Sequence, residues 1–371
     1  MLMINYGNKI TYRTETKSVM VRNVRIGGGA PIPVQSMTNV DSRNEEALIE
    51  QLAILKDAGC DIVRIAIPDR ESVTVFKSVR KKTDIPLVAD IHFDYRLAIE
   101  AILAGADKIR INPGNIGSDD CVKKVVCCAK EHGAAIRVGV NSGSLENDIL
   151  IKNKGVTAEG LAESAIRNIR KLEDMDFDDV VLSIKSSDVQ MNYKAHMIAA
   201  RLTDHPLHIG ITESGIPSSG KVKSAAGIGA LLLAGIGDTI RVSLTADPVE
   251  EVLFARRLLE VLAFRKPKFE LISCPTCGRT KVNIKALADE ADRRLSKTDW
   301  LPQGLKIAVM GCVVNGPGEA GETDYCICGG NGKGIVYAHG QKVISVAEDR
   351  LIDAMMDVIK SDCKQGGEGG E

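Results

Sequence analysis

Three cysteines in the last third of the chain have a spacing that suits metal binding. Cys274 and Cys277 form a CxxC pair, and Cys312 follows in the phrase GCVVNGPGE. Such cysteines hold zinc or an iron–sulfur cluster, and a CxxC pair also serves as a redox dithiol. A CxC pair, Cys326 and Cys328, offers a further sulfur ligand. The spacing therefore indicates a metal centre or a redox dithiol.

The surroundings of these cysteines favour an iron–sulfur cluster. A zinc ribbon normally has a second CxxC pair, and a thioredoxin-type dithiol lies in a βαβ unit near the start of a domain. Three thiolates and one non-cysteine ligand leave one iron of a cluster chemically open. Glu319, seven residues after Cys312, is an oxygen ligand that is able to leave. The phrase NGPGEAG is interpreted as a tight loop whose amides donate to cluster sulfurs.

A second set of residues is cationic and lies within short β-branched runs, with apolar neighbours on both sides. Side chains alternate between the faces of a strand, so cations in a sheet covered outside by helices must point inward. Burying like charges is costly unless an anion balances them. Diphosphate is a suitable anion, because a guanidinium group forms two parallel hydrogen bonds to phosphate oxygens. The alternative is a set of polar layers paired with carboxylates. The cations are Arg64, Arg110, Arg137, Lys185 and Arg241.

Polar side chains at the ends of the same runs extend this set. Asp90, Glu213 and Asp188 are the few carboxylates near the strand ends. His92, close to Asp90, is a candidate for substrate contact or proton transfer, although a lone histidine is more often structural. The residues expected to gather at one mouth are Asp90, His92, Asn112, Asn141, Ser183, Glu213 and Ser243.

Eight predicted strands, alternating with helices, position these side chains. Helical patterns at 44–59, 95–105 and 158–174 separate them, with apolar residues at helical spacing. Eight strands without a GxGxxG after the first favour a TIM (β/α)8 barrel over an open doubly wound sheet. In such a barrel the strand carboxyl ends build the active site. The predicted strands are 33–38, 61–68, 86–93, 107–114, 134–141, 179–186, 206–213 and 238–245.

The repeated pattern of strands and helices ends after residue 265. The segment before the CxxC pair is interpreted as a basic linker; the CxxC then opens a helix at 281–297, and a strand at 305–311 precedes Cys312. We therefore expect a barrel over 1–265 and a smaller α+β iron–sulfur domain over 266–371. The tail 363–371 is expected to be disordered.

Composition excludes several classes of function. The chain has 48 basic and 49 acidic residues, and aromatic residues make up only 4%, which argues against a nucleic-acid partner. The N-terminus has no apolar secretory segment, and the longest apolar stretch, 225–237, is too short to span a membrane and is read as a buried helix. We expect a cytoplasmic protein in which metal binding or catalysis explains the number of cysteines, ten, better than disulfides do. The cysteines interpreted as packing or surface thiols are Cys60, Cys121, Cys127, Cys128 and Cys363.

Motifs over nearly the whole chain resemble the bacterial 4-hydroxy-3-methylbut-2-enyl diphosphate synthases of the two-domain form. The resemblance implies a 4Fe–4S cluster held by Cys274, Cys277, Cys312 and Glu319. It also implies that 2-C-methyl-D-erythritol 2,4-cyclodiphosphate is reduced by two electrons, with ring opening and loss of water. It further implies a homodimer in which the cluster domain of one subunit covers the barrel mouth of the other. The motifs are CPTCGRT, GCVVNGPGE, PVQSMTNVD, VRIAIP, ADIHF, RINPGN, RVGVNSGSL, SIKSSD, TESG and RVSLTADP.

Within this interpretation, the five cations hold the cyclic diphosphate, and Glu213, with His92 second, is the candidate proton donor. The chain has no flavin or nicotinamide fingerprint, so flavodoxin or ferredoxin is expected to supply electrons. Cys326 and Cys328 depart from the resemblance, because the family usually has small residues at these positions.

Two other functional classes fit part of the pattern. One is a zinc-containing, aldolase-like barrel enzyme whose cations bind a sugar phosphate. The other is a non-enzymatic phosphate sensor or nucleic-acid module with a zinc knuckle.

Overall fold

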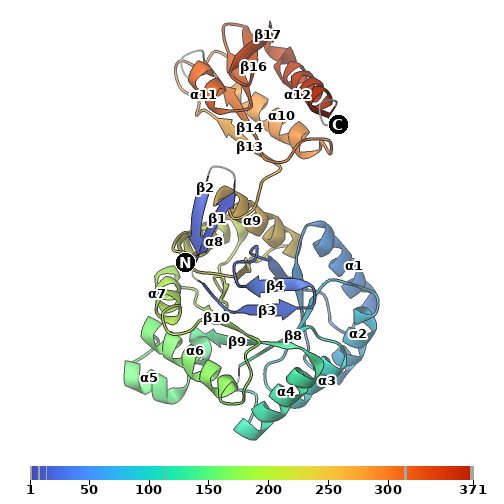
Figure 1. The fold of residues 1–371 in the computed structure, drawn as a ribbon, viewed down its shortest axis with the longest axis vertical. Helices are drawn as coiled ribbons and strands as arrows, with labels where there is room; N and C mark the ends of the chain where they lie inside the picture. Colours follow the sequence, from blue (N-terminus) through green and yellow to red (C-terminus); the bar gives the residue numbers. More distant parts are fainter. Residues whose placement is uncertain (1, 7–8, 14, 113, 313–315, 368–371) are drawn as a thin grey trace. The chain divides into compact units, whose positions relative to one another are not determined.

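The computed structural model describes residues 2–6, 9–13, 15–112, 114–312 and 316–367. The chain divides into two compact units, Met1–Arg265 and Lys266–Glu371 (Figure 1). Each unit has a hydrophobic core of its own. The two units therefore fold around separate cores.

The first unit is a barrel of parallel strands that follow one another in sequence order. Strands β5 to β10 form one sheet, and β11 and β12 form a separate pair. Two isolated bridges, Leu182↔Leu207 and Val34↔Ile240, join that pair to both edges of the larger sheet and close it. The predicted TIM barrel is confirmed. Its strands are β5 (Gln35–Met37), β6 (Ile62–Ala66), β7 (Leu87–Asp90), β8 (Lys108–Ile111), β9 (Ala135–Asn141), β10 (Val180–Lys185), β11 (His208–Ile209) and β12 (Thr239–Ile240).

Helices between the strands surround the barrel (Figure 1). Caps set their starts: the Asn44 side chain accepts from the amide of Ala47 before α1, and Thr157 accepts from Gly160 before α6. None of the helices in the described ranges is long and apolar enough to cross a membrane. The helices of this unit are α1 (Glu45–Asp57), α2 (Arg70–Arg80), α3 (Tyr95–Leu103), α4 (Asp119–His132), α5 (Asn147–Asn153), α6 (Ala158–Glu173), α7 (Val189–Ala199), α8 (Pro217–Leu233) and α9 (Pro248–Val261).

The last two strands are shorter than the sequence predicted. The runs 206–213 and 238–245 contain only the two-residue strands β11 and β12. After β11 the backbone at Gly210 passes so close to Arg241 that a β-carbon would overlap the Arg241 carbonyl oxygen. This approach requires glycine. Because β11 and β12 end early, Glu213 and Ser243 lie in loops beyond these strands.

Two hairpins at the N-terminus were not predicted. They are β1 (Leu2–Tyr6) with β2 (Lys9–Arg13), and β3 (Ser18–Val21) with β4 (Val24–Gly27). The β3–β4 hairpin buries Val19, Val21 and Ile26 against residues near the starts of the barrel strands, among them Ile62 and Val181. It therefore covers the end of the barrel opposite the strand carboxyl ends.

The second unit is a five-stranded sheet with helices on both faces. Strands β13 (Phe269–Ser273), β14 (Leu305–Met310) and β15 (Tyr325–Gly329) are parallel, and β16 (Lys333–Ala338) and β17 (Gln341–Ala347) continue the sheet antiparallel. Helices α10 (Ile284–Ser296) and α12 (Leu351–Gly367) share the core of one face. Helix α11 (Gly316–Glu322) contributes Ala320 to a smaller cluster with Cys326 and Cys328.

Several predictions for this unit were wrong in detail. The segment before the CxxC pair contains strand β13 rather than a linker, because its apolar residues pair with β14. The CxxC pair lies in the loop after β13, seven residues before α10 begins. The described part of NGPGEAG is helical, since proline fits the first turn of a helix. Helix α12 continues to Gly367, so the tail is helical up to there, and residues 368–371 lie outside the described ranges.

The close approach at Gly210 gives a test of the barrel. We expect Gly210→Ala to lower the stability of the barrel by about 1–3 kcal/mol, because the new methyl group must displace backbone. Gly229→Ala, in the interior of α8, is the matched control. A β-carbon there meets only Leu262, at 3.8 Å, so stability should stay level or rise by about 0.5–1 kcal/mol. Urea unfolding followed by circular dichroism measures both, and equal effects would contradict the assignment.

Candidate active site

The five predicted cations lie in the interior of the barrel or at its mouth. Arg110, Arg137 and Lys185 are buried on β8, β9 and β10, and the side chains of Arg64 and Arg241 are only 12% and 14% exposed. The pairing register places Arg110 beside Asp90 on one side and Arg137 on the other. The structure therefore brings together residues from strands that are far apart in the sequence.

Asp90 is the carboxylate around which three of these residues gather. One of its oxygens lies 3.9 Å from Nε of Arg64 and 3.4 Å from Nε2 of His92, and the other lies 3.5 Å from Nη1 of Arg110. His92 in turn lies 3.0 Å from Nη1 of Arg110. Burial would raise the pKa of Asp90, but Arg64, the His92 hydrogen bond, Arg110 and Arg137 together hold it well below its usual range. Asp90 is therefore ionised and orients two arginines.

Glu251 in α9 is a second buried carboxylate that contacts one of the cations, and the sequence analysis missed it. It lies 3.9 Å from Nη2 of Arg241, accepts a hydrogen bond from the amide of Leu244 at 2.7 Å, and accepts one from the Ser36 hydroxyl at 3.5 Å. Burial raises its pKa, and Arg241 opposes that rise. No sequence signal separates Glu251 from other acidic residues early in a helix. Its contact with Arg241 appears only in the closed barrel.

The positive charges in this region outnumber the carboxylates. Among the described residues, Asp90 forms ion pairs with Arg64 and Arg110, and Glu251 forms one with Arg241. Arg137 and Lys185 have no carboxylate partner in this part of the chain. Burial lowers the pKa of Lys185 and of Arg137, and the neighbouring arginines lower both further. Burial and Arg64 likewise lower the pKa of Arg241, to about 10. A bound anion would relieve this repulsion, so the arrangement favours a ligand with several negative charges.

The remaining predicted polar residues border the same strand ends. Asn112 and Ser183 are buried, and the Asn112 side chain accepts a hydrogen bond from the amide of Gly114 at 3.1 Å. Asn141 ends β9 and is half-buried. The carbonyl of Ser243 accepts a hydrogen bond from the Ser214 hydroxyl. These side chains and backbone groups fix the loops at the mouth.

Glu213 lies apart from the Asp90 cluster as an exposed side chain in the loop after β11. Its backbone is in the left-handed region, with φ 50°. Such a conformation costs of order 1 kcal/mol for a residue other than glycine and is frequent at functional sites.

Two of the predicted thiols lie at one edge of the sheet in the second unit. Cys274 directly follows β13, and Cys312 follows β14 after Gly311. Because β13 and β14 are parallel neighbours, their carboxyl ends meet at the same edge. The amide of Gly311 donates to Sγ of Cys274 at 3.3 Å. This backbone donor is directed at the sulfur of Cys274.

Cys277 and Glu319 complete the predicted ligand set. Cys277 is exposed, and hydrogen bonds from Arg279 and then Thr280 lower the pKa of its thiol. Glu319 is half-buried in α11, whose Ala320 packs on the same cluster of residues that Cys274 contacts. Cys326 and Cys328 lie in that cluster too, buried, with their sulfurs 3.6 Å apart. The thiols are therefore clustered at one edge of the sheet and one of its faces.

Three thiols and a carboxylate are donors that can hold an iron–sulfur cluster or a zinc ion. A tetrahedral zinc site with Zn–S distances near 2.3 Å holds its sulfurs roughly 3.8 Å apart. Among the described residues, the one group of three metal-ligating side chains with all ligand atoms within 4.8 Å is Glu173, Asp178 and His205, on the barrel. Cys274, Cys277 and Cys312 form no such compact group among the described residues.

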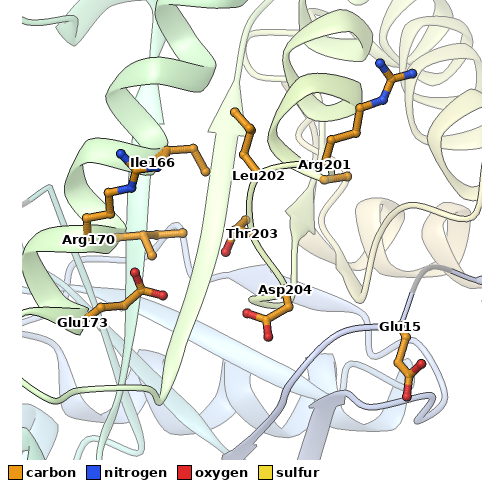
Figure 2. Close-up of a pocket in the computed structure, with 10 residues that line it drawn as sticks. Glu15, Ile166, Arg170, Glu173, Arg201, Leu202, Thr203 and Asp204 are labelled. Atoms are coloured by element: carbon orange, nitrogen blue, oxygen red, sulfur yellow. The ribbon is translucent and has the colours of Figure 1, made fainter.

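A surface pocket of the barrel is separate from the predicted residues. Figure 2 shows it between Arg170 and Glu173 of α6 and the segment after α7 that carries Arg201 and Asp204. This segment leads into β11, so the pocket lies toward the end where strands begin. It contains charges of both signs and none of the predicted site residues.

Comparison with known proteins identifies the family. The model described as the GcpE TIM-barrel domain matches residues 16–256, and the model of the GcpE protein C-terminal domain matches residues 270–361. The chain belongs to the GcpE family. The barrel match contains every cation from Arg64 to Arg241, and the C-terminal match contains Cys274, Cys277, Cys312 and Glu319.

Curated relatives match almost their whole length. A protein of Caldanaerobacter subterraneus is 51% identical over 96% of this chain and 99% of its own length. A protein of Clostridium acetobutylicum is 51% identical over 93% of this chain and 98% of its own. A protein of Bacillus cytotoxicus is 48% identical over 97% of this chain and 98% of its own length. Each is named 4-hydroxy-3-methylbut-2-en-1-yl diphosphate synthase (flavodoxin).

The Asp90 cluster predicts a pH-dependent stability. Because the pKa of Asp90 is lower in the folded barrel than in the unfolded chain, its contribution is present above about pH 4 and is lost as the pH falls further. We expect Asp90→Asn to cost about 3 kcal/mol or more at pH 7, since it leaves two arginines unanswered, and to weaken the acid sensitivity. Urea unfolding at several pH values measures this, with Glu131→Gln on the exposed face of α4 as the control. An Asp90→Asn protein as acid-sensitive as the natural one would contradict the assignment.

Proposed function

We propose that this chain is a flavodoxin-dependent 4-hydroxy-3-methylbut-2-en-1-yl diphosphate synthase that acts on 2-C-methyl-D-erythritol 2,4-cyclodiphosphate. The observation that carries the proposal is the separation of two kinds of chemistry on one chain. The barrel gathers five cations against two carboxylates, and the second unit carries three thiols and a carboxylate around one sheet edge. The names and near-complete coverage of the relatives support the same activity.

The cations are proposed to bind the diphosphate. Arginine forks match phosphoryl oxygens, and Lys185 adds a point charge. Opening the ring develops negative charge on the leaving oxygen, which these preorganised cations stabilise. Asp90 orients Arg64 and Arg110 for this task, and Glu251 orients Arg241. Asn112, Asn141, Ser183 and Ser243 are proposed to hydrogen-bond the substrate around this charged centre.

Cys274, Cys277, Cys312 and Glu319 are proposed to hold a 4Fe–4S cluster. When bound, the cluster supplies single electrons and an iron with Lewis-acid character. The Gly311 amide donates to Sγ of Cys274, and hydrogen bonds from Arg279 and Thr280 lower the pKa of the Cys277 thiol. Glu319 is the ligand proposed to leave, because a carboxylate binds iron less firmly than a thiolate. Flavodoxin is proposed as the electron donor.

Loss of the substrate hydroxyl as water requires a proton donor. We assign this role to Glu213, whose exposed side chain lies in the loop after β11, where the backbone is left-handed. His92 is the second candidate, but its hydrogen bonds to Asp90 and Arg110 suit a role in orienting the cations.

A direct assay tests the proposed function. Protein purified without oxygen should be brown, contain about four irons per chain and convert the cyclodiphosphate when reduced flavodoxin is supplied. Lys185→Met should lower kcat/KM by at least about 100-fold, a loss of about 3 kcal/mol of transition-state binding. The exposed Lys123→Met is the control. A colourless zinc protein that cleaves or condenses sugar phosphates would instead support the aldolase-like alternative.

Active sites shared between two subunits are also proposed, with the cluster unit of one chain serving the barrel of its partner. Mixing Lys185→Ala protein with Cys274→Ala protein should then restore activity, because the heterodimer contains one active site in which both the barrel and the cluster unit are intact. Tagged heterodimers purified from co-expression provide the material, and each single-variant homodimer is the control. Verified heterodimers with no activity would contradict the shared site.

A further inference from the structure

The barrel contains a second group of polar side chains closer to its closed end. Gln35, Lys108, Arg137 and His208 are 1%, 0%, 2% and 0% exposed. They come from β5, β8, β9 and β11, so they approach one interior from several sides. Of these four, the sequence analysis named only Arg137.

Register shows that these side chains point into the barrel. Lys108 precedes the inward Arg110 by two residues on β8. Gln35 precedes Met37 by two residues, and the sulfur of Met37 accepts from Arg64 at 2.9 Å. His208 precedes Gly210, where a β-carbon would lie 3.4 Å from Nζ of Lys185. Residues two apart on a strand share a face.

Lys108 lies below the level proposed for the diphosphate. Two residues along a strand correspond to about 6.6 Å, and its register partners Val88 and Ala135 pack against the β3–β4 hairpin. A diphosphate that binds Arg64, Arg110 and Lys185 at the mouth therefore leaves Lys108 and His208 without an anionic partner.

Several polar atoms in this group have no hydrogen-bond partner among the described residues. They are Nζ of Lys108, Nε and Nη1 of Arg137, both ring nitrogens of His208 and the amide of Gln35. The charges that act on Lys108 come from Arg137 and Arg64, and those on His208 come from cations alone. Asp90 and Glu251 are engaged by Arg64, Arg110 and Arg241. Buried cations without a counter-charge are costly.

We propose that Lys108, Arg137 and His208, with the side-chain amide of Gln35, form an internal binding site for one small inorganic anion of the halide class. The site offers donors from four strands, which suits an anion that accepts from every direction. The interior of an eight-stranded barrel is only wide enough for side chains or one small ligand, so a monatomic ion fits best. Arg137 belongs to both this site and the substrate site, so the bound anion would help to orient it.

Crystals of the full-length protein, isolated without oxygen and soaked in sodium bromide, test the site directly. One anomalous bromide peak is expected between Lys108 and His208. Peaks confined to the mouth, or ordered water alone between these side chains, would overturn the proposal. Neither substrate nor turnover is involved, so failure here leaves the proposed function untouched, and failure of the assay leaves this site untouched.

Thermal unfolding tests the same site in solution. At constant ionic strength, replacing a bulky organic anion with bromide should raise the unfolding temperature of the barrel, because a ligand that binds only the folded state stabilises it. Lys108→Met should lose this bromide-specific shift and unfold no earlier than the natural protein without halide. Lys123→Met is the control and should keep the shift. A shift in Lys108→Met equal to that of the natural protein would overturn the proposal. If the methionine variant does not fold, Lys108→Gln is tested in its place.

Discussion

Positive charge buried inside a closed sheet is the constraint on which the rest of the barrel depends. Each of the strands β6, β8, β9 and β10 places a lysine or arginine in the interior, and Arg241 follows β12. Two carboxylates partly balance them, one on a strand and one on a helix. The excess positive charge is costly to bury and is relieved by a bound anion, so the fold favours an anionic ligand.

The two ends of the barrel have different roles because of this charge. At the mouth, loops hold Glu213 and Ser243 beyond the short strands β11 and β12, so polar groups surround the opening. At the other end, the β3–β4 hairpin covers the strand starts with apolar side chains. The hairpin keeps water from the lower cations, which strengthens every electrostatic interaction above it.

The second unit uses the same principle of strand ends for a different chemistry. Cys274 and Cys312 come together because β13 and β14 are parallel neighbours, and the Gly311 amide donates to one of the sulfurs. Thiolates need hydrogen-bond donors, whereas phosphoryl groups need cations, and the chain separates the two needs into units with separate cores. GcpE-family membership over both units agrees with this division.

The sequence by itself was enough to predict the barrel, its inward cations and the thiol ligands. Strand periodicity, apolar neighbours and cysteine spacing are local properties that residue types express directly. Only the tertiary structure decided which charges meet. Nothing in the sequence singles out Glu251, Lys108 or His208. In the structure, Lys108 and His208 face the interior of the closed barrel, and Glu251 reaches Arg241 from helix α9. The helical form of α11 and the short strands at Gly210 likewise depend on packing and backbone approach, which no local pattern contains.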